Sequence, residues 1–232
     1  MDETRKPIEI GILVFPNVTQ LDLTGPYEVL SRVSDARVHL LWQDTKPVVS
    51  DRGLILTPTL AFASAHAMDV ILVPGGPGVG PLMEDETVLA FLRKQVETVR
   101  YVTSVCTGAL VLGAAGLLRG YHATTHWTAL SMLTRLGAIA SSDRIVVDRN
   151  RITGGGVTAG IDFALRLVAT LRTEDEARLI QLQMEYNPAP PFDSGHPDTA
   201  DPAIVSRARA AAAKMSESRM AIVDRVAARL SH

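Results

Sequence analysis

Runs of apolar residues alternate along the chain with amphipathic stretches typical of helices. Residues 8–15 (IEIGILVF) and 69–73 (DVILV) are almost continuously apolar, as expected of parallel strands covered on both faces. This alternation predicts an α/β fold with a mainly parallel sheet between two layers of helices. Further strands are predicted at 38–42, 54–57 and 101–105, with a hairpin or strand pair at 144–147 and 151–153. Residues 21–33 are predicted to form a loop and then a helix with Pro26 near its first turn, and further helices are predicted at 87–99, 107–115, 161–171, 174–186 and 203–230.

The last part of the chain has a different pattern. Residues 187–202 (NPAPPFDSGHPDTADP) form a proline-rich connector, and residues 203–230 are rich in alanine and arginine. Apolar positions in this last segment recur at helical spacing, which predicts a long helix. We expect it to pack either on its own domain or on a second subunit.

Composition narrows the class of protein. Of the 232 residues, 47% are hydrophobic, which is enough for a core and argues against disorder. The net charge of −2 excludes a strong polyanion binder, so we expect no nucleic acid partner. The apolar runs are too short for a membrane span. The polar N-terminal segment 1–7 (MDETRKP) has no signal-peptide pattern, and we expect a cytoplasmic protein.

Metal and disulfide chemistry have little support in the sequence. A single cysteine excludes an internal disulfide framework and a multi-cysteine metal site, and it fits a reducing compartment. The histidines show no ligand-like spacing with acidic residues, so we expect neither a metal nor a cofactor. These histidines are His39, His66, His122, His126, His196 and His232.

Cys106 lies where the predicted strand 101–105 meets the predicted helix 107–115. This order is typical of a nucleophile elbow, in which the nucleophile occupies a sharp turn between strand and helix. The helix N-terminus carries partial positive charge, so we expect a lowered pKa for the thiol. Small residues such as Gly108 allow the turn to pack closely. The alternative is a buried, inert cysteine, since free cysteines are commonly buried.

A reactive thiol needs a partner that handles its proton. Asp22 stands out because it lies between Leu21 and Leu23, where a carboxylate is costly unless it is paired or protonated. Its alternative role is an N-cap, although Thr24 is nearer the expected helix start. His126 (ATTHW) could also approach the site, and its alternative role is structural. The other candidates are Glu28, Asp69, His122 and Asp162.

Two glycine-rich turns follow predicted strands. Residues 74–80 (PGGPGVG) lack the GxGxxG spacing and are not followed by the lysine of a P-loop, so we expect no nucleotide. Their backbone N–H groups could instead form an oxyanion hole beside the thiol. Residues 153–160 (TGGGVTAG) are either a wall of the pocket or only a tight turn. Parallel strands end at one edge of a sheet, which would bring both turns to Cys106.

Three motifs taken in order resemble the ThiJ/PfpI superfamily. They are PGG at 74–76, SVCTGALVLGAAGLL at 104–118 and TGGGVTAGIDFAL at 153–165. The resemblance covers about residues 7–172 and implies a flavodoxin-like three-layer α/β sandwich, usually dimeric. It also implies a cysteine hydrogen-bonded to an acid from an earlier loop. We therefore expect a catalytic domain at 7–172, a helical C-terminal extension at 173–232, and a homodimer.

Within that superfamily, LDLTGP, ATTHW and EYNPAPPFDSGHPD resemble the bacterial isocyanide hydratases. The resemblance implies hydration of a small isocyanide to an N-substituted formamide through a thioimidate on Cys106. It implies that Asp22 is the general acid and base, and that Thr107 orients water or the acid. The expected substrate-binding residues are Gly75, Gly76, Thr24, His126, Trp127 and Gly156.

Departures from sister groups leave two alternatives open. Protease-like members have histidine where this chain has Thr107, and glyoxalase or deglycase members usually have glutamate where it has Asp22. AraC-type regulators share CTG and ATTHW, but the tail here has no basic recognition helix. The alternatives are a glyoxalase-, deglycase- or amidase-like cysteine enzyme, and a non-enzymatic thiol redox sensor.

Overall fold

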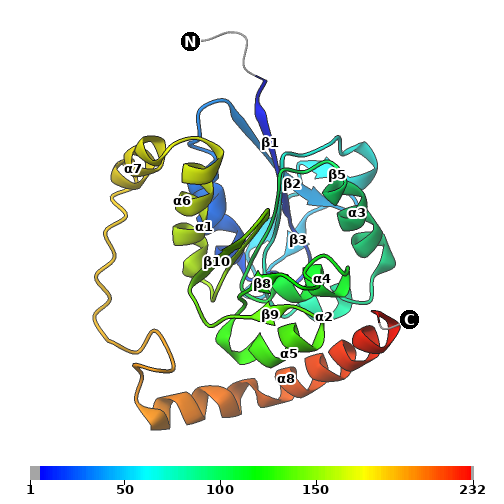
Figure 1. The fold of residues 1–232 in the computed structure, drawn as a ribbon, viewed down its shortest axis with the longest axis vertical. Coiled ribbons are helices and arrows are strands. Elements are labelled where there is room, and N and C mark those ends of the chain that lie inside the picture. Colours follow the sequence, from blue (N-terminus) through cyan, green and yellow to red (C-terminus); the bar gives the residue numbers. More distant parts are fainter. Residues whose placement is uncertain (1–5, 231–232) are drawn as a thin grey trace.

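Seven strands form one central sheet in the order β10-β11-β7-β6-β1-β2-β5 in the computed structural model, which describes residues 6–230 (Figure 1). All neighbours are parallel except β10 and β11, which form the expected antiparallel pair. Most of the polar N-terminal segment, and His232, lie outside the described residues. The strands are β1 (Ile8–Leu13), β2 (Ala36–Trp42), β5 (Leu60–Ala61), β6 (Val70–Val73), β7 (Tyr101–Val105), β10 (Ile145–Asp148) and β11 (Arg151–Gly154).

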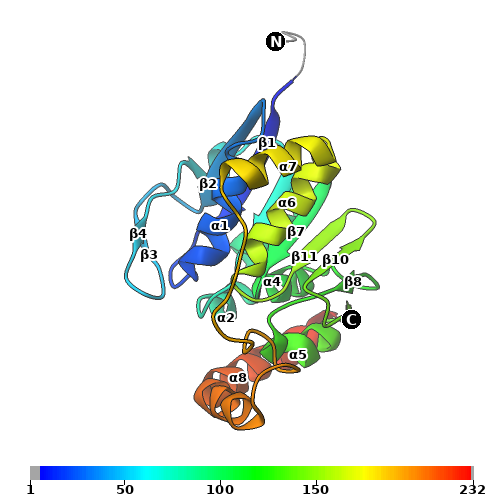
Figure 2. The ribbon, with the colours of Figure 1, turned by 90° about the vertical axis from the view of Figure 1, so that its left-hand side faces the viewer.

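Helices cover both faces of this sheet, which confirms the predicted three-layer sandwich. Figure 2 shows α1, α6 and α7 on one face, and α3 and α4 lie on the other. Every residue of β1 and β6 is buried, as their continuously apolar sequences require. The helices are α1 (Gln20–Leu30), α2 (Val79–Leu82), α3 (Glu86–Val96), α4 (Gly108–Ala114), α6 (Ala159–Leu171) and α7 (Glu174–Gln183).

The hydrophobic pattern missed several short elements. The expected strand at 54–57 is only β4 (Ile55–Leu56), which pairs antiparallel with β3 (Val48–Val49). A second small sheet joins β8 (His122–Ala123) to β9 (Ile139–Ala140). Two-residue strands are too short to show a period of two. The remaining short elements are α5 (Leu130–Arg135) and the 3₁₀ turns η1 (Phe62–Ser64) and η2 (Trp127–Ala129).

Helix α1 begins earlier than the sequence predicted. Its first residue is Gln20, so Thr19 occupies the N-cap position and the expected N-cap role of Thr24 is wrong. The Thr24 hydroxyl instead donates to Gln20 Oε1 at 2.8 Å. Pro26 lies inside the helix rather than in its first turn, and it lacks the N–H that would bond to the carbonyl oxygen of Asp22.

The C-terminal helix α8 (Pro202–Leu230) crosses below the sheet and packs on the same chain (Figure 1). It contacts α2, α4, η2 and α5, with Val223 and Val226 buried against them. Of the two arrangements expected for the tail, this single chain adopts packing on its own domain. No helix within residues 6–230 combines the length and apolarity needed to cross a membrane.

Candidate active site

Cys106 occupies a sharp turn between β7 and α4. Its φ of +55° lies in the left-handed region, which non-glycine residues rarely adopt. Its N–H donates to the carbonyl oxygens of Gly154 and Gly155 at 3.0 and 2.8 Å, and its carbonyl accepts from Thr125 Oγ1 at 2.8 Å. The neighbouring turns therefore fix the backbone conformation. This is the geometry of a nucleophile elbow, as the sequence predicted.

The elbow is pressed against the turn that follows β6. A Cβ atom at Gly108 would lie 1.9 Å from the carbonyl oxygen of Val73, and one at Gly75 would lie 2.6 Å from Thr107 N. Neither position has space for any side chain. The two glycines thus bring the β6 turn to the thiol, at the edge where ligands bind in sheets of this class.

Asp22 enters this site from the first turn of α1 and is fully buried. Its Oδ2 accepts a hydrogen bond from Gly75 N–H at 3.0 Å, whereas Oδ1 has no partner of ordinary hydrogen-bond geometry among the described residues. Burial raises the pKa of the carboxyl group to about 7, against the opposing effect of hydrogen bonds from the Cys106 thiol and Gly75. The negative charge of Asp51, which accepts from the Thr19 hydroxyl, raises it further.

The Cys106 thiol is also buried, which changes its acidity. Burial raises its pKa well above the usual value, and the Asp22 carboxylate adds to this effect. Hydrogen bonds from the Thr107 N–H and side chain oppose the rise without overcoming it. The expectation of a lowered thiol pKa is therefore wrong for this state, because desolvation outweighs the N-terminus of a seven-residue helix. The arrangement favours a neutral thiol beside a carboxyl group that can take its proton.

The amides of the first glycine turn already have partners. Gly75 N–H donates to Asp22, and Gly76 N–H donates to Thr107 Oγ1 at 3.1 Å. The expected oxyanion hole is therefore not free for a substrate. These amides instead orient the acid and the threonine hydroxyl, whose proton is left to donate to the thiol. Cys106, Asp22, Thr107, Gly75 and Gly76 thus form one cluster.

Arg219 reaches this cluster from α8, and sequence reasoning missed it. It is buried and donates to the carbonyl oxygen of Gly76 at 3.2 Å, and it makes no ion pair with any residue in the described part of the chain. Burial lowers the pKa of Arg219, and the negative charge of a Cys106 thiolate raises it. The sequence feature that could have identified Arg219 is its helical spacing with Val223 and Val226, two buried residues of the tail.

His126 and Gly156 lie against each other. A Cβ at Gly156 would come 3.0 Å from the His126 ring, whose Nδ1 is hydrogen-bonded to Thr128 Oγ1 at 2.8 Å. Burial lowers the pKa of His126, with a further contribution from Arg219. Trp127 borders an open cleft of about 290 Å³ between η2 and α8. Cys106 does not line this cleft, which is bordered by Trp127, Thr128, Arg209, Ala212, Ala213 and Ser216.

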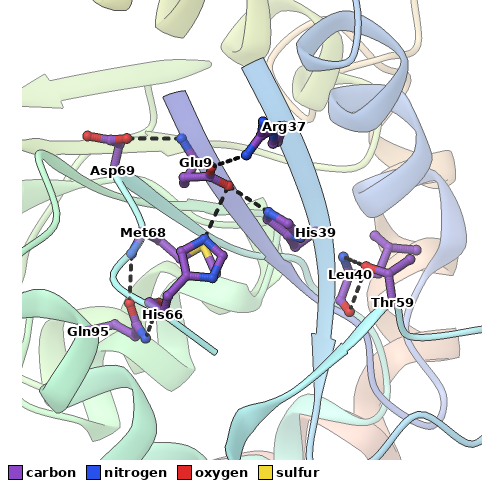
Figure 3. Close-up of polar contacts among 9 residues, drawn as sticks. All are labelled: Glu9, Arg37, His39, Leu40, Thr59, His66, Met68, Asp69 and Gln95. Carbon is purple, nitrogen blue, oxygen red and sulfur yellow. Dashed lines mark hydrogen bonds and ion pairs between the residues drawn. The ribbon is translucent and has the colours of Figure 1, made fainter. Parts of the chain in front are cut away.

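The expectation that no histidine lies at ligand spacing from an acid is wrong. Glu9, His39 and His66 place one donor atom each within 4.8 Å of one another. Glu9 lies near the amino end of β1, His39 lies in the middle of β2 and His66 lies in the loop before β6 (Figure 3). Cys106 instead follows the carboxyl end of β7. Sequence spacing could not reveal this group, because its members come from three separate segments.

Comparisons with known proteins agree with this geometry. A model of the DJ-1/PfpI family matches residues 9–170. Isonitrile hydratase from Pseudomonas putida is 58% identical over 97% of this chain and 98% of its own length. The HTH-type transcriptional regulator GbdR from Pseudomonas aeruginosa is 35% identical, over 72% of this chain and 47% of the regulator. The match to the hydratase thus extends through the tail, whereas the match to the regulator does not.

A solved structure has the same overall arrangement. The crystal structure of a THiJ/PfpI family protein from Pseudomonas syringae is 40% identical and superposes with a TM-score of 0.91. The superposition covers 94% of this chain and 90% of that chain. The shared arrangement therefore includes most of the helical extension as well as the sheet.

Proposed function

Since the chain belongs to the DJ-1/PfpI family, we propose that it is an isocyanide hydratase that converts isocyanides to N-substituted formamides at Cys106. Isonitrile is another name for isocyanide, and the 58% identity to the Pseudomonas putida enzyme supports this substrate class. The observation that carries the mechanism is the buried pair of Asp22 and Cys106. With a pKa of about 7, Asp22 can both accept and return a proton near neutral pH.

The first half of the reaction adds the thiol across the terminal carbon. The Asp22 carboxylate accepts the thiol proton as the sulfur attacks that carbon, forming the C–S bond. Protonated Asp22 then delivers the same proton to the carbon. The product is a thioimidate in which the carbon carries hydrogen, sulfur and a double bond to nitrogen, and Asp22 is again a carboxylate.

The second half adds water. Asp22 takes a proton from a water molecule, whose oxygen attacks the thioimidate carbon, and passes that proton to the nitrogen. The C–S bond breaks as the C=O bond forms, and the hydroxyl proton of the adduct passes to the sulfur, which leaves as the thiol. The released product is an N-substituted formamide, so atoms balance with one isocyanide and one water. Neither half requires a cofactor.

Three neighbours support these steps. The Thr107 N–H and hydroxyl stabilise negative charge on sulfur, and the positive charge of the Arg219 guanidinium adds to this effect. Gly75 holds the Asp22 carboxylate in place. We assign contact with the substituent of the isocyanide to Thr24, His126, Trp127 and Gly156, which leaves Gly75 and Gly76 as positioning residues.

The direct test is to follow formamide formation from an alkyl isocyanide by chromatography. We expect turnover by the wild type, none by Cys106→Ala and a severe loss in Asp22→Asn. Ser104→Ala is the matched control. The Ser104 hydroxyl is buried next to the elbow and has no hydrogen-bond partner among residues 6–230. A wild type that ignores isocyanides and converts methylglyoxal would establish the glyoxalase-like alternative. If neither is converted and Cys106 oxidises readily, the redox-sensor alternative gains support.

We further propose that the enzyme is a cytoplasmic homodimer, with a catalytic domain at 7–172 and the tail as an extension. Exposed apolar residues on α7, Leu179 and Leu182, support a second subunit, because they would otherwise face water. Light scattering at micromolar concentration should give twice the chain mass. A monomeric mass would refute the dimer without affecting the proposed reaction.

A further inference from the structure

We propose that Glu9, His39 and His66 form a binding site for a divalent transition-metal ion, with Zn²⁺ as its best-matched occupant. His39 Nε2 lies 2.7 Å and His66 Nε2 3.2 Å from the same oxygen, Glu9 Oε2. The three donor atoms lie within 4.8 Å of one another. Figure 3 shows both imidazole rings turned toward the carboxylate from different elements.

The donor set selects the class of metal. Two imidazole nitrogens and one carboxylate suit Zn²⁺ and its neighbours in the first transition row, whereas Mg²⁺ and Ca²⁺ prefer oxygen donors. Tetrahedral zinc with bonds near 2.0–2.1 Å spaces its donors by about 3.3 Å. The separations of 2.7 and 3.2 Å from Glu9 Oε2 would open by about 0.6 and 0.1 Å to match this spacing, and the fourth position is left for water.

The surrounding structure holds these ligands in place. Glu9 is buried at the start of β1, and its N–H donates to Asp69 Oδ2 at 2.9 Å. Gln95 fixes the loop that carries His66, since it accepts from Met68 N–H and donates to the carbonyl of His66, both at 3.1 Å. Such secondary contacts are typical of metal sites, where they orient the ligands.

Strand register brings Glu9 and His39 to the same face of the sheet. β1 and β2 are parallel, with Glu9 opposite Arg37 and Gly11 opposite His39. Residues two apart in a strand share a face, so the side chains of Glu9 and His39 lie on one side of the sheet. Gly11, on the same face, has no side chain, and a Cβ there would lie 2.5 Å from Leu41 Cδ1. The loop before β6 then brings His66 over the same face.

The local charge fits a cation. Glu9 supplies the acidic ligand, and its Oε2 faces the Nε2 atoms of both histidines. Arg37 Nη1 lies 3.4 Å from the other oxygen, Oε1, and opposes a second positive charge. Its side chain is 66% exposed, so it can turn into water when a metal binds.

The place of the site in the fold indicates its role. It joins the amino end of β1, the middle of β2 and the loop before β6, whereas Cys106 follows the carboxyl end of β7. A bound ion would therefore tie this edge of the sheet together without touching the thiol. This inference is independent of the proposed hydratase activity.

Isothermal titration with Zn²⁺ tests the site in tag-free, metal-stripped Cys106→Ala protein, since the thiol is itself a zinc ligand. We expect one ion per chain and a higher melting temperature with Zn²⁺. Loss of even an outer-shell partner weakens a metal site by about 10- to 100-fold, so His66→Ala should weaken binding at least tenfold. The His66 side chain is half-exposed, so this variant should fold.

His122→Ala is the matched control, because His122 is an exposed histidine paired with Asp148 elsewhere on the surface. It should bind Zn²⁺ as tightly as the parent protein. The visible absorption of Co²⁺ in the parent, reduced in His66→Ala and in His39→Ala, would identify the nitrogen ligands. Absence of stoichiometric binding, or equal binding by the parent and His66→Ala, would overturn the site.

Discussion

The guanidinium of Arg219 donates a 3.2 Å hydrogen bond to the carbonyl oxygen of Gly76, which lies 143 positions earlier in the chain. This contact joins the C-terminal helix to the turn that positions the catalytic pair. Arg219 is buried without an ion pair among residues 6–230, and its positive charge attracts a negative charge on Cys106. The tail therefore contributes a residue to the proposed active site.

Replacing this charge should slow the thiol chemistry. We expect Arg219→Met to lower kcat/KM by at least about tenfold, since one pKa unit on the thiol corresponds to 1.36 kcal/mol. Alkylation of Cys106 by iodoacetamide should slow in parallel, and Arg219→Lys should restore part of both rates. Arg225→Met is the matched control, because Arg225 is on the same helix but exposed and paired with Glu84. Equal effects from both variants would contradict the role of Arg219.

The acidity of Asp22 should be visible in the pH profile. Protonated Asp22 cannot accept the thiol proton, so kcat/KM should fall about tenfold per pH unit below its pKa of about 7. The profile is measured as initial rates of formamide formation between pH 5 and 8. In Asp22→Asn the residual rate should lose this acidic limb. A limb that persists in the variant would belong to another group.

The same shift predicts a pH-dependent stability. The pKa of Asp22 rises from the ordinary aspartate value of 3.8 to about 7 in the folded protein, so folding favours the protonated form. Its contribution is fully present below about pH 4 and is lost as the pH rises through 7. Asp22→Asn should therefore gain stability relative to wild type between pH 4 and 8, by up to roughly 4 kcal/mol.

Urea unfolding of both proteins at pH 4.5 and 8 measures this difference. The asparagine retains an oxygen that can accept from Gly75, which keeps the comparison close to one of charge alone. A stability difference that is the same at both pH values would show that Asp22 does not titrate between them. That result would also remove the physical basis for its role as acid and base.

The contact between the elbow and β6 leaves no room at Gly108. A Cβ there would lie 1.9 Å from the backbone oxygen of Val73, so Gly108→Ala must displace the elbow from the strand. We expect a loss of about 1–3 kcal/mol or more in unfolding free energy, together with loss of turnover. Gly195→Ala is the control, because a Cβ at Gly195 would have no atom of the described residues within 4 Å apart from its chain neighbours. Thermal melting and the formamide assay report the two effects.

Local pattern was enough to predict the parts of the fold that depend on continuous burial. The strands β1, β6 and β7 were predicted because their apolar runs can exist only in the middle of a covered sheet. The position of Cys106 between a strand and a helix predicted a nucleophile. The position of Asp22 between two leucines predicted a buried carboxylate that needs a partner or a proton. The resemblance to the ThiJ/PfpI superfamily then implied that an acid from an earlier loop is hydrogen-bonded to the cysteine.

Only the tertiary structure decided the chemistry of the site. The pKa values of Cys106 and Asp22 depend on how completely distant segments exclude water, and Arg219 enters from a helix whose docking the periodicity left open. The group of Glu9, His39 and His66 likewise depends on strand register and on one loop. A sequence records which residues prefer burial, whereas charge, hydrogen bonds and metal ligands depend on which segments come together in space.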